Sequence, residues 1–387
     1  MIRNLREEYY KFFKNRTINP VFFFSPGRVN LIGEHTDYNL GFVLPCALEY
    51  GTYLAAAPNN SGTIRLRTLN FDYYLDTSID RIEKNNDGKW VNYPLGVILE
   101  FLARDINIGG LDLLYSGNIP NGAGLSSSAS IEMVTAVAIN SLFNAGIDML
   151  DMVKMSQSAE NSFVGMNCGI MDQFAAGFGK KDSAIFLNCD TLEYRNVPLM
   201  LNDYSLVIVN TNKRRGLTDS KYNQRRAECE TAVKLVSAIK KIDHLSQLSI
   251  EDIDLLEEAI DDRLILKRAR HVLSENNRVL EAVKALYRED IGRFGELMNE
   301  SHDSLKNDYD VTGNELDTLV YEARKIDGVI GSRMTGAGFG GCTVNLVDRS
   351  KTAAFISQLD RKYTELTGLK ADFYLPAIGE GAGRVRS

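Results

Sequence analysis

Residues 116–130 read Ser116-Gly117-Asn118-Ile119-Pro120-Asn121-Gly122-Ala123-Gly124-Leu125-Ser126-Ser127-Ser128-Ala129-Ser130. A strand-like run over 111–115 precedes this stretch, and a helical pattern over 126–143 follows it. Glycines let backbone N–H groups turn towards an anion, and the amino end of a helix attracts negative charge through its dipole. Helix capping alone would explain one serine but not the whole arrangement. The stretch therefore predicts a phosphate-binding loop between a strand and a helix.

Two better-known glycine patterns are excluded by their context. Gly117 and Gly122 have the separation found in a Walker A loop, but Ala123 stands where that loop requires lysine. Residues 336–341 match G-x-G-x-x-G, yet a strand-like run follows them where a dinucleotide-binding fingerprint must open a helix. The stretch 334–342 is instead typical of a glycine loop between two strands that closely approaches another segment or a ligand.

A third polar stretch lies near the amino terminus. Glu34, His35 and Asp37 fall within four positions directly after an apolar run. Carboxylates accept hydrogen bonds from adjacent hydroxyl groups, so the cluster suits a hydroxyl-rich ligand. A polar turn with an Arg–Asp ion pair is an equally good interpretation of this segment alone. Farther along, Asp172 lies in a mostly apolar stretch and needs a partner, for which Arg28 is the natural candidate.

In the rest of the chain, the order of strand-like and helical segments predicts an α+β fold. Strand-like runs over 21–24, 52–57, 63–69, 111–115, 184–187 and 205–209 alternate with helical patterns over 90–103, 126–143 and 150–163. The chain is strongly helical from about 221 to 326 and closes with a β-α-β pattern between 329 and 375. A length of 387 residues favours two domains, which we expect over 1–200 and 201–387.

Composition narrows the class of protein. The chain carries 44 basic and 51 acidic residues, a net charge of −7, without long runs of one sign. This argues against a nucleic-acid-binding protein, which needs a basic face. Five scattered cysteines without a CxxC pair indicate neither a disulfide framework nor a zinc site. The start is too charged for a signal peptide and no run of 18 apolar residues is present, so we expect a cytoplasmic protein without a membrane partner.

Together the three loops resemble the GHMP small-molecule kinases, and the galactokinase branch of that family in particular. Residues 27–38 are similar to the galactokinase signature, 116–130 to the family's phosphate loop and 334–342 to its third motif, in family order. The resemblance implies an amino-terminal ribosomal-protein-S5-like α/β domain and a carboxyl-terminal ferredoxin-like domain with extra helices. The implied reaction is ATP-dependent phosphorylation of galactose at its C1 hydroxyl to galactose 1-phosphate, the first step of galactose catabolism. Only small-molecule partners and a monomer are expected.

The resemblance also implies roles for individual residues. The sugar would contact Glu34, His35, Thr36, Asp37, Gly169 and Tyr222. ATP would contact Thr68, Gly122, Ala123, Gly124, Leu125, Ser126, Ser127 and Ser128, and Ser128 and Glu160 would place Mg²⁺, a cation that takes oxygen ligands. Asp172 would face the reacting hydroxyl with Arg28 beside it, and Asp37 is our choice for reading the C4 hydroxyl. Two positions depart from the family pattern: Thr68 replaces a common serine, and Ala337 lies in a loop that is often all glycine and so must have a negative φ.

Two rival functions stay open. A related kinase for mevalonate or homoserine is disfavoured by the polar cluster at 34–37, whereas N-acetylgalactosamine remains a possible substrate. The other rival is a sensor that binds sugar and ATP without turnover. Such relatives lack the serine–alanine pair of the phosphate loop, which this chain has as Ser128-Ala129, so catalysis is favoured.

Overall fold

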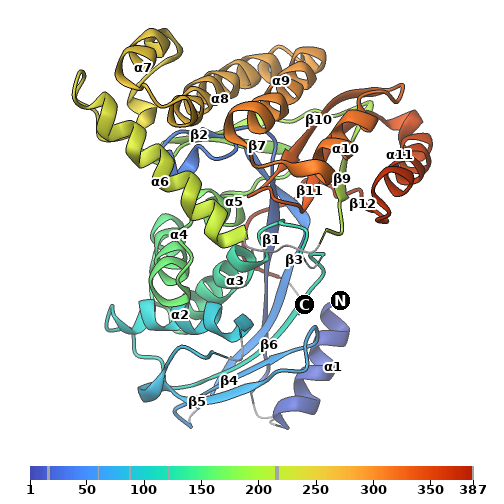
Figure 1. The fold of residues 1–387 in the computed structure, drawn as a ribbon. Coiled ribbons are helices and arrows are strands. Elements are labelled where there is room, and N and C mark those ends of the chain that lie inside the picture. The colour runs from blue at the N-terminus through green and yellow to red at the C-terminus, as the bar shows by residue number, and fades with distance from the viewer. Residues whose placement is uncertain (15–17, 60, 87–88, 121, 214–217, 386–387) are drawn as a thin grey trace.

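A six-stranded sheet lies at the centre of the amino-terminal half (Figure 1). The computed structural model describes residues 1–14, 18–59, 61–86, 89–120, 122–213 and 218–385. In sheet order the strands are β13 (Gly383–Arg384), β1 (Val21–Asn30), β3 (Pro45–Pro58), β6 (Leu111–Gly117), β4 (Thr63–Thr68) and β5 (Leu75–Ser78). β4 and β6 pair in parallel, and the other neighbours pair antiparallel.

Helices cover both faces of this sheet. Successive strand residues point to opposite faces, so Phe22 packs with the first helix while Phe23 packs with the helices on the other side. The first helix is α1 (Ile2–Phe13); the others are α2 (Asn92–Leu102), α3 (Ser127–Leu142), α4 (Met149–Ser158) and α5 (Met171–Phe178). The helices α1 and α5 were not predicted. The segment of α1 was interpreted only as a charged terminus, although Leu5, Tyr9 and Phe13 form a buried stripe at helical spacing.

The carboxyl-terminal half is built on an antiparallel four-stranded sheet. Its order is β10 (Val329–Thr335), β11 (Cys342–Asp348), β9 (Tyr204–Asn210) and β12 (Asp372–Tyr374). One face packs on α10 (Gly313–Ala323) and α11 (Thr352–Thr367). The other face packs on α8 (Arg263–Tyr287), α9 (Ile291–Ser304) and residues of β1 and β3. The expected closing β-α-β pattern is confirmed.

Two further groups of elements complete the fold. A small antiparallel sheet contains β2 (Phe42–Val43), β7 (Ser183–Asn188) and β8 (Tyr194–Pro198). The helices α6 (Thr218–Val236) and α7 (Ile253–Ala259) pack with α8, which confirms the helix-rich stretch predicted there. The α+β class is also confirmed. The tail returns to the first sheet, where β13 pairs with β1, and the division near residue 200 stays a prediction.

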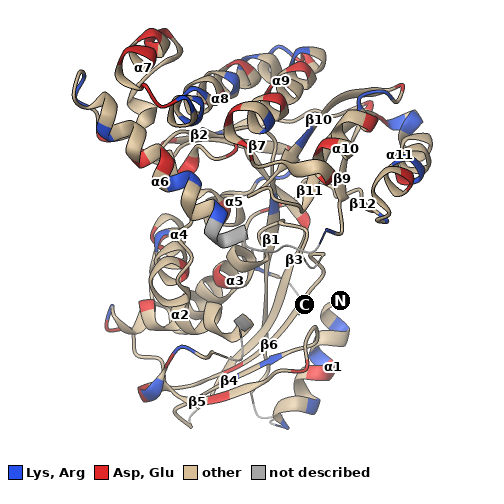
Figure 2. Ribbon diagram, viewed as in Figure 1, with Lys and Arg blue, Asp and Glu red and all other residues tan. Residues whose placement is uncertain are grey.

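Charged residues lie mainly on the outer helices. Figure 2 shows both signs along α6, α8, α9 and α11, acidic residues along α7, and few charges on the central strands. Among the charged residues on the strands, Arg28 in β1 and Arg333 in β10 are buried, at 5% and 0% exposed. A buried guanidinium needs partners, so both positions point to a polar site inside the molecule. None of the helices in the described ranges has the length and apolar content that crossing a bilayer requires.

Candidate active site

An ion pair between Arg28 and Asp172 lies at the centre of the site. Arg28 follows an irregularity in β1, and Asp172 lies in the first turn of α5. The guanidinium Nε is 2.7 Å from Oδ1 and Nη2 is 2.9 Å from Oδ2, a two-point contact that fixes both planes. The pairing expected from the sequence is confirmed. Arg28 also donates to the carbonyl oxygen of Gly124 at 2.8 Å, which joins the pair to the glycine–serine loop (residues 122–128).

The glycine–serine loop leaves polar groups free at the start of α3. Ser126 precedes the helix in a left-handed conformation, with φ 58°, and its hydroxyl donates to Asp172 Oδ2 at 2.6 Å instead of capping the helix. Among the described residues, none accepts a hydrogen bond from the backbone N–H groups of Ser126, Ser127 or Ser128. Unpaired amides at the positive end of a helix form an anion-binding site.

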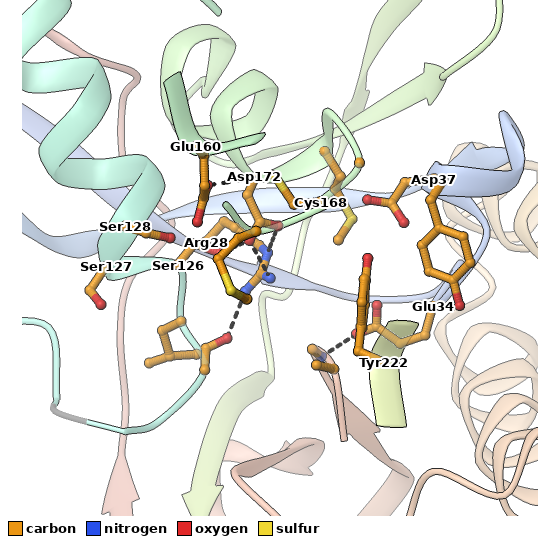
Figure 3. Close-up of a pocket in the computed structure, with 18 of the residues that line it drawn as sticks. Arg28, Glu34, Asp37, Ser126, Ser127, Ser128, Glu160, Cys168, Asp172 and Tyr222 are labelled. Atoms are coloured by element: carbon orange, nitrogen blue, oxygen red, sulfur yellow. Dashed lines mark hydrogen bonds and ion pairs between the residues drawn. The ribbon is translucent and has the colours of Figure 1, made fainter. Parts of the chain in front are cut away.

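A cavity of about 280 Å³ connects this loop with residues of the carboxyl-terminal half. Figure 3 shows Ser127 and Ser128 at one side of it, Arg28 and Asp172 in the middle, and Glu34, Asp37 and Tyr222 at the other side. Gly336 and Ala337 also line it. The cavity therefore has a side lined by serines and backbone amides, a side rich in carboxylate and phenol groups, and an ion pair between them.

A buried carboxyl cluster lies behind the serines. Glu160 follows α4 in a π-helical turn (Ala159–Val164), and its Oε2 accepts from Gln173 Nε2 at 2.6 Å. The same amide donates to Glu132 at 3.0 Å. Burial first, and then the charge of Asp172, raise the pKa of Glu160 to about 7, against hydrogen bonds that include one from Ser128. Glu160 and Glu132 therefore take up a proton near neutral pH unless a cation lies beside them.

Asp37 points into the opposite side of the cavity. It is the last residue of the signature loop (residues 33–37) and the first of a short 3-10 turn (Asp37–Asn39), and it is 9% exposed. Burial first, and then the charges of Asp172 and Glu34, raise the pKa of Asp37 to about 7. A Cβ at Gly169 would overlap the Asp37 carboxylate, so only glycine leaves room for this side chain. Tyr222 of α6 packs its ring near His35, with centroids 5.6 Å apart.

Glu34 joins the signature loop (residues 33–37) to the third loop (residues 336–341). It is 1% exposed, and its Oε1 accepts from Gly336 N at 2.5 Å and from Thr335 Oγ1 at 3.0 Å. Its Oε2 accepts from Asn30 Nδ2 at 2.6 Å. The expected close approach of the third loop to another segment is therefore confirmed. Ala337 lacks a positive φ, as expected, but Phe339 has a φ of 57° that the sequence did not indicate.

His35 is held by hydrogen bonds at both ring nitrogens. A carbonyl oxygen only accepts, so Nε2–H donates to Ala337 O at 3.2 Å and Nδ1 accepts from the Tyr38 hydroxyl at 2.8 Å. Burial first, and then the charge of His271, lower the pKa of His35 to about 3, and the ring is neutral. The Tyr38 oxygen in turn lies 2.8 Å from the Tyr309 hydroxyl. Both nitrogens of His35 already have protein partners.

Two predicted residues point away from the cavity. Thr36 is 0% exposed, and its hydroxyl lies 2.9 Å from the carbonyl oxygen of Gly33 and 2.8 Å from that of Phe42. It braces the turn of the signature loop. Ala123 is also fully buried and packs in the apolar core beneath the glycine–serine loop. Any contact of these two residues with a ligand stays a prediction.

A second, partly aromatic cavity of about 180 Å³ adjoins the serines. Thr68 lines it, as do Asn70, Phe71, Trp90, Tyr93, Tyr115 and Ile119. Ser127 and Ser128 line both cavities. Thr68 was predicted to contact ATP, but the aromatic residues of this cavity were not predicted. Residues 90–103 were interpreted only as a helix. Glu132 and Gln173 were missed as well, since one polar residue within a helix gives no signal of its own.

Three family models match the chain. The galactokinase galactose-binding signature covers residues 7–58, the GHMP kinases N terminal domain covers 92–180, and the GHMP kinases C terminal model covers 282–365. The fold and the two-sided site, with these matches, define the class as a GHMP small-molecule kinase.

Closer relatives place the chain within that class. The galactokinase of Fusobacterium nucleatum is 51% identical over 390 residues, which cover 100% of both chains. The crystal structure of Lactococcus lactis galactokinase complexed with galactose matches with a TM-score of 0.96 and 44% identity, covering 99% of this chain and 100% of that one. The chain belongs to the galactokinase family. The resemblance noted in the sequence is thereby confirmed.

A more distant structure shares the fold alone. Mevalonate kinase of Methanococcus jannaschii matches with a TM-score of 0.68 and 21% identity, over 95% of this chain and 100% of that chain. The two-domain GHMP architecture expected from the sequence is confirmed by these matches.

Proposed function

We propose that this chain transfers the γ-phosphoryl group of ATP to the C1 hydroxyl of galactose, forming galactose 1-phosphate and ADP, the first step of galactose catabolism. The observation that carries the proposal is the position of the Arg28–Asp172 pair between the two sides of one cavity (Figure 3). Phosphoryl transfer needs little covalent help from a protein and depends on positioning and charge neutralisation. An ion pair between an anion-binding loop and a hydroxyl-binding site meets that need.

The glycine–serine loop would hold the triphosphate. The free amides of Ser126 to Ser128 and the amino end of α3 provide donors and a favourable dipole for phosphoryl oxygens. The adjoining aromatic cavity, with Thr68 and Trp90 in its wall, would take the adenine. Because Ser127 and Ser128 line both cavities, one nucleotide can span them with its γ-phosphoryl group towards Arg28.

The site fits Mg²⁺ between the glycine–serine loop and Glu160. The hydroxyl of Ser128 and the carboxylate of Glu160, which lie within hydrogen-bond reach of each other, would supply oxygen ligands of the kind that Mg²⁺ prefers. Glu132 Oε1 is buried without a hydrogen-bond partner among the described residues, and burial and the neighbouring Glu160 raise the pKa of Glu132 well above its ordinary value, so a cation beside the two carboxyl groups would favour their ionised forms. Bound with ATP, Mg²⁺ would neutralise charge on the β- and γ-phosphoryl oxygens. Ser128 and Glu160 would hold it.

Asp172 would accept the proton of the C1 hydroxyl. Its carboxylate already accepts hydrogen bonds from Arg28 at both oxygens and from Ser126 at Oδ2. These contacts fix the orientation of the carboxylate, and the proton would move to it as the O–P bond forms, because phosphoryl transfer through a loose transition state needs no earlier removal of the proton. Arg28 would offset charge on the transferring phosphoryl group, and ADP leaves with the electron pair of the broken P–O bond.

Asp37 would read the axial C4 hydroxyl that distinguishes galactose from glucose. It is buried, it points into the cavity, and Gly169 leaves room for it. An epimer whose hydroxyl points elsewhere leaves a buried acceptor unpaired, which is costly. Glu34 and Tyr222 would contact the other hydroxyl groups. His35 has both nitrogens bonded to protein, so it would contribute the face or edge of its ring.

A coupled ADP-release assay tests this function against its rivals. We expect ADP release with galactose and none with mevalonate or homoserine; release with N-acetylgalactosamine would widen the substrate class. A sensor without turnover would bind galactose and ATP yet release no ADP above the rate without sugar. That outcome would overturn the proposed activity.

We further propose a monomer of two domains, 1–200 and 201–387, that acts in the cytoplasm. Its five free cysteines suit a reducing compartment. Light scattering coupled to size-exclusion chromatography tests the monomer, and limited proteolysis tests the domain boundary.

A further inference from the structure

The signature loop is attached to a helix more than two hundred residues away in the sequence. Three residues of α8 at four-residue spacing, His271, Glu275 and Val279, face the backbone of Gly33 and Glu34. Gly33 has a φ of 95°, and a Cβ there would lie 2.9 Å from Val279 Cγ2. The loop backbone therefore approaches α8 as closely as only glycine allows.

Glu275 binds both amides of this turn. Its Oε1 accepts from Gly33 N at 2.9 Å and from Glu34 N at 3.3 Å. The Ser301 hydroxyl of α9 donates to the same oxygen at 2.6 Å, and Arg278 pairs with Oε2 at 2.7 Å. Burial alone would raise the pKa of Glu275, but the charges of Arg278, His271 and Arg333 and the Ser301 hydrogen bond lower it to about 2. A fully buried carboxylate is thus ionised and completely paired.

His271 holds the carbonyl of the same residue. Its Nε2–H donates to Glu34 O at 3.0 Å, and its Nδ1 accepts from the Ser304 hydroxyl of α9 at 2.9 Å. The N–H and the C=O of Glu34 are therefore both bonded to α8. Two contacts between α8 and α9, Glu275–Ser301 and His271–Ser304, brace this arrangement from behind.

We propose that Glu275 is a positioning residue for the signature loop: it fixes the backbone of Gly33 and Glu34 so that Glu34 to Asp37 have their sugar-binding arrangement before the sugar arrives. The inference rests on the proposed function for the identity of the ligand. Glu275 does not line the cavity and acts through the loop. Preorganisation of this kind lowers the entropy cost of binding, so its loss weakens galactose binding and leaves the nucleotide site unaffected.

The test is Glu275→Gln. The loop amides and Arg278 only donate, whereas a glutamine has one accepting and one donating end, so one of the two contacts is lost. We expect the galactose KM and Kd to rise roughly 10- to 100-fold, the effect of losing a hydrogen bond to a buried charge. The ATP KM should stay within about twofold of wild type, since Glu275 lines neither of the two cavities proposed to hold the nucleotide. Glu281→Gln on the same helix is the matched control, because Glu281 makes only an exposed pair with Lys284.

Amide hydrogen exchange supplies a readout that does not depend on the reaction. In the absence of sugar, Gly33 and Glu34 should exchange faster in Glu275→Gln than in wild type and in the control, with slow exchange elsewhere in α8 and α9 retained. If the wild type fails to phosphorylate galactose, the proposed function falls, while faster exchange at Gly33 and Glu34 still supports the positioning of the loop.

A second variant covers the case in which Glu275→Gln folds poorly. Ser301→Ala keeps the carboxylate and its Arg278 pair but removes one donor, and we expect the galactose KM to rise roughly two- to tenfold. Unchanged galactose KM with unchanged loop exchange in a folded variant would overturn the inference. Parallel changes in galactose and ATP kinetics that track a lower melting temperature would also overturn it, because they indicate a structural role only.

Discussion

The signature loop and the glycine–serine loop lie on the two sides of the Arg28–Asp172 ion pair. They differ in whether their polar groups form hydrogen bonds with the rest of the protein. In the signature loop, the backbone of Gly33 and Glu34 and the side chains of Glu34 to Thr36 bind other parts of the chain. In the glycine–serine loop, the amides of Ser126 to Ser128 have no acceptor among the described residues. The backbone of Gly33 and Glu34 in the first loop is hydrogen-bonded without a ligand, whereas the amides of Ser126 to Ser128 in the second have no acceptor among the described residues.

The difference follows from the chemistry of the two proposed ligands. A neutral sugar offers only hydroxyl groups, so selectivity depends on acceptors held at fixed positions before it binds. A triphosphate is strongly charged and supplies acceptors for any free amide at a helix start. Variants in the two loops should therefore fail in different ways.

The largest effect is expected at the ion pair that both loops share. Asp172→Asn should remove most turnover, roughly 10²–10⁴-fold in kcat, because general-base help is lost. The fold and galactose affinity should change little, since asparagine has the same shape. Steady-state kinetics and calorimetric galactose binding measure the two quantities, and a kcat near wild type would refute the role of Asp172.

On the side of the cavity proposed to bind the sugar, Asp37→Ala should lower the kcat/KM for galactose on the order of 10²-fold, because a hydrogen bond to a charged group is lost. Wild type should prefer galactose over glucose by roughly 10⁴-fold, and the variant should narrow that ratio. The ratio is the informative quantity, because Asp37 also helps to shape the loop. If the variant prefers galactose over glucose as strongly as wild type does, the C4 hydroxyl is recognised by Glu34, His35 or Tyr222 instead.

The raised pKa of Asp37 predicts a pH dependence of galactose binding. With a pKa of about 7, this carboxyl is protonated below neutrality and loses its capacity to accept at both oxygens. Galactose KM should therefore be lowest above pH 7 and rise about tenfold per pH unit below it. Asp37→Asn should flatten this profile, while the pH profile of the ATP KM is retained. A flat wild-type profile from pH 6 to 8 would contradict the prediction.

The smallest effect is expected in the glycine–serine loop. Ser128→Ala should raise the ATP KM and the Mg²⁺ requirement several-fold, with galactose KM unchanged. A serine that only caps α3 would instead lower stability by ~1 kcal/mol with normal kinetics. Melting temperature and Mg²⁺ titration of the same variant distinguish these outcomes.

Local pattern predicted much of the fold. Runs rich in β-branched and aromatic residues located β1, β3, β4 and β6, and helical patterns located α2 and α3, because residue type and spacing favour these structures locally. Short elements such as α5 and β13 were missed, since their stability comes from packing rather than from their own sequence. For the site, the pairing of Arg28 with Asp172 followed from the need to neutralise a charge in apolar surroundings.

The sequence by itself determined the three loops, the order in which they occur and the kinds of side chain they carry. Tertiary structure alone decided which distant groups meet: Glu34 with Gly336, Gly33 with Glu275, and the aromatic residues around Thr68. It also decided the pKa of Asp37, which depends on burial and on neighbours far along the chain. The physical reason is that glycine conformation and strand or helix period are properties of neighbouring residues. Hydrogen-bond partners and desolvation depend instead on how separate elements pack.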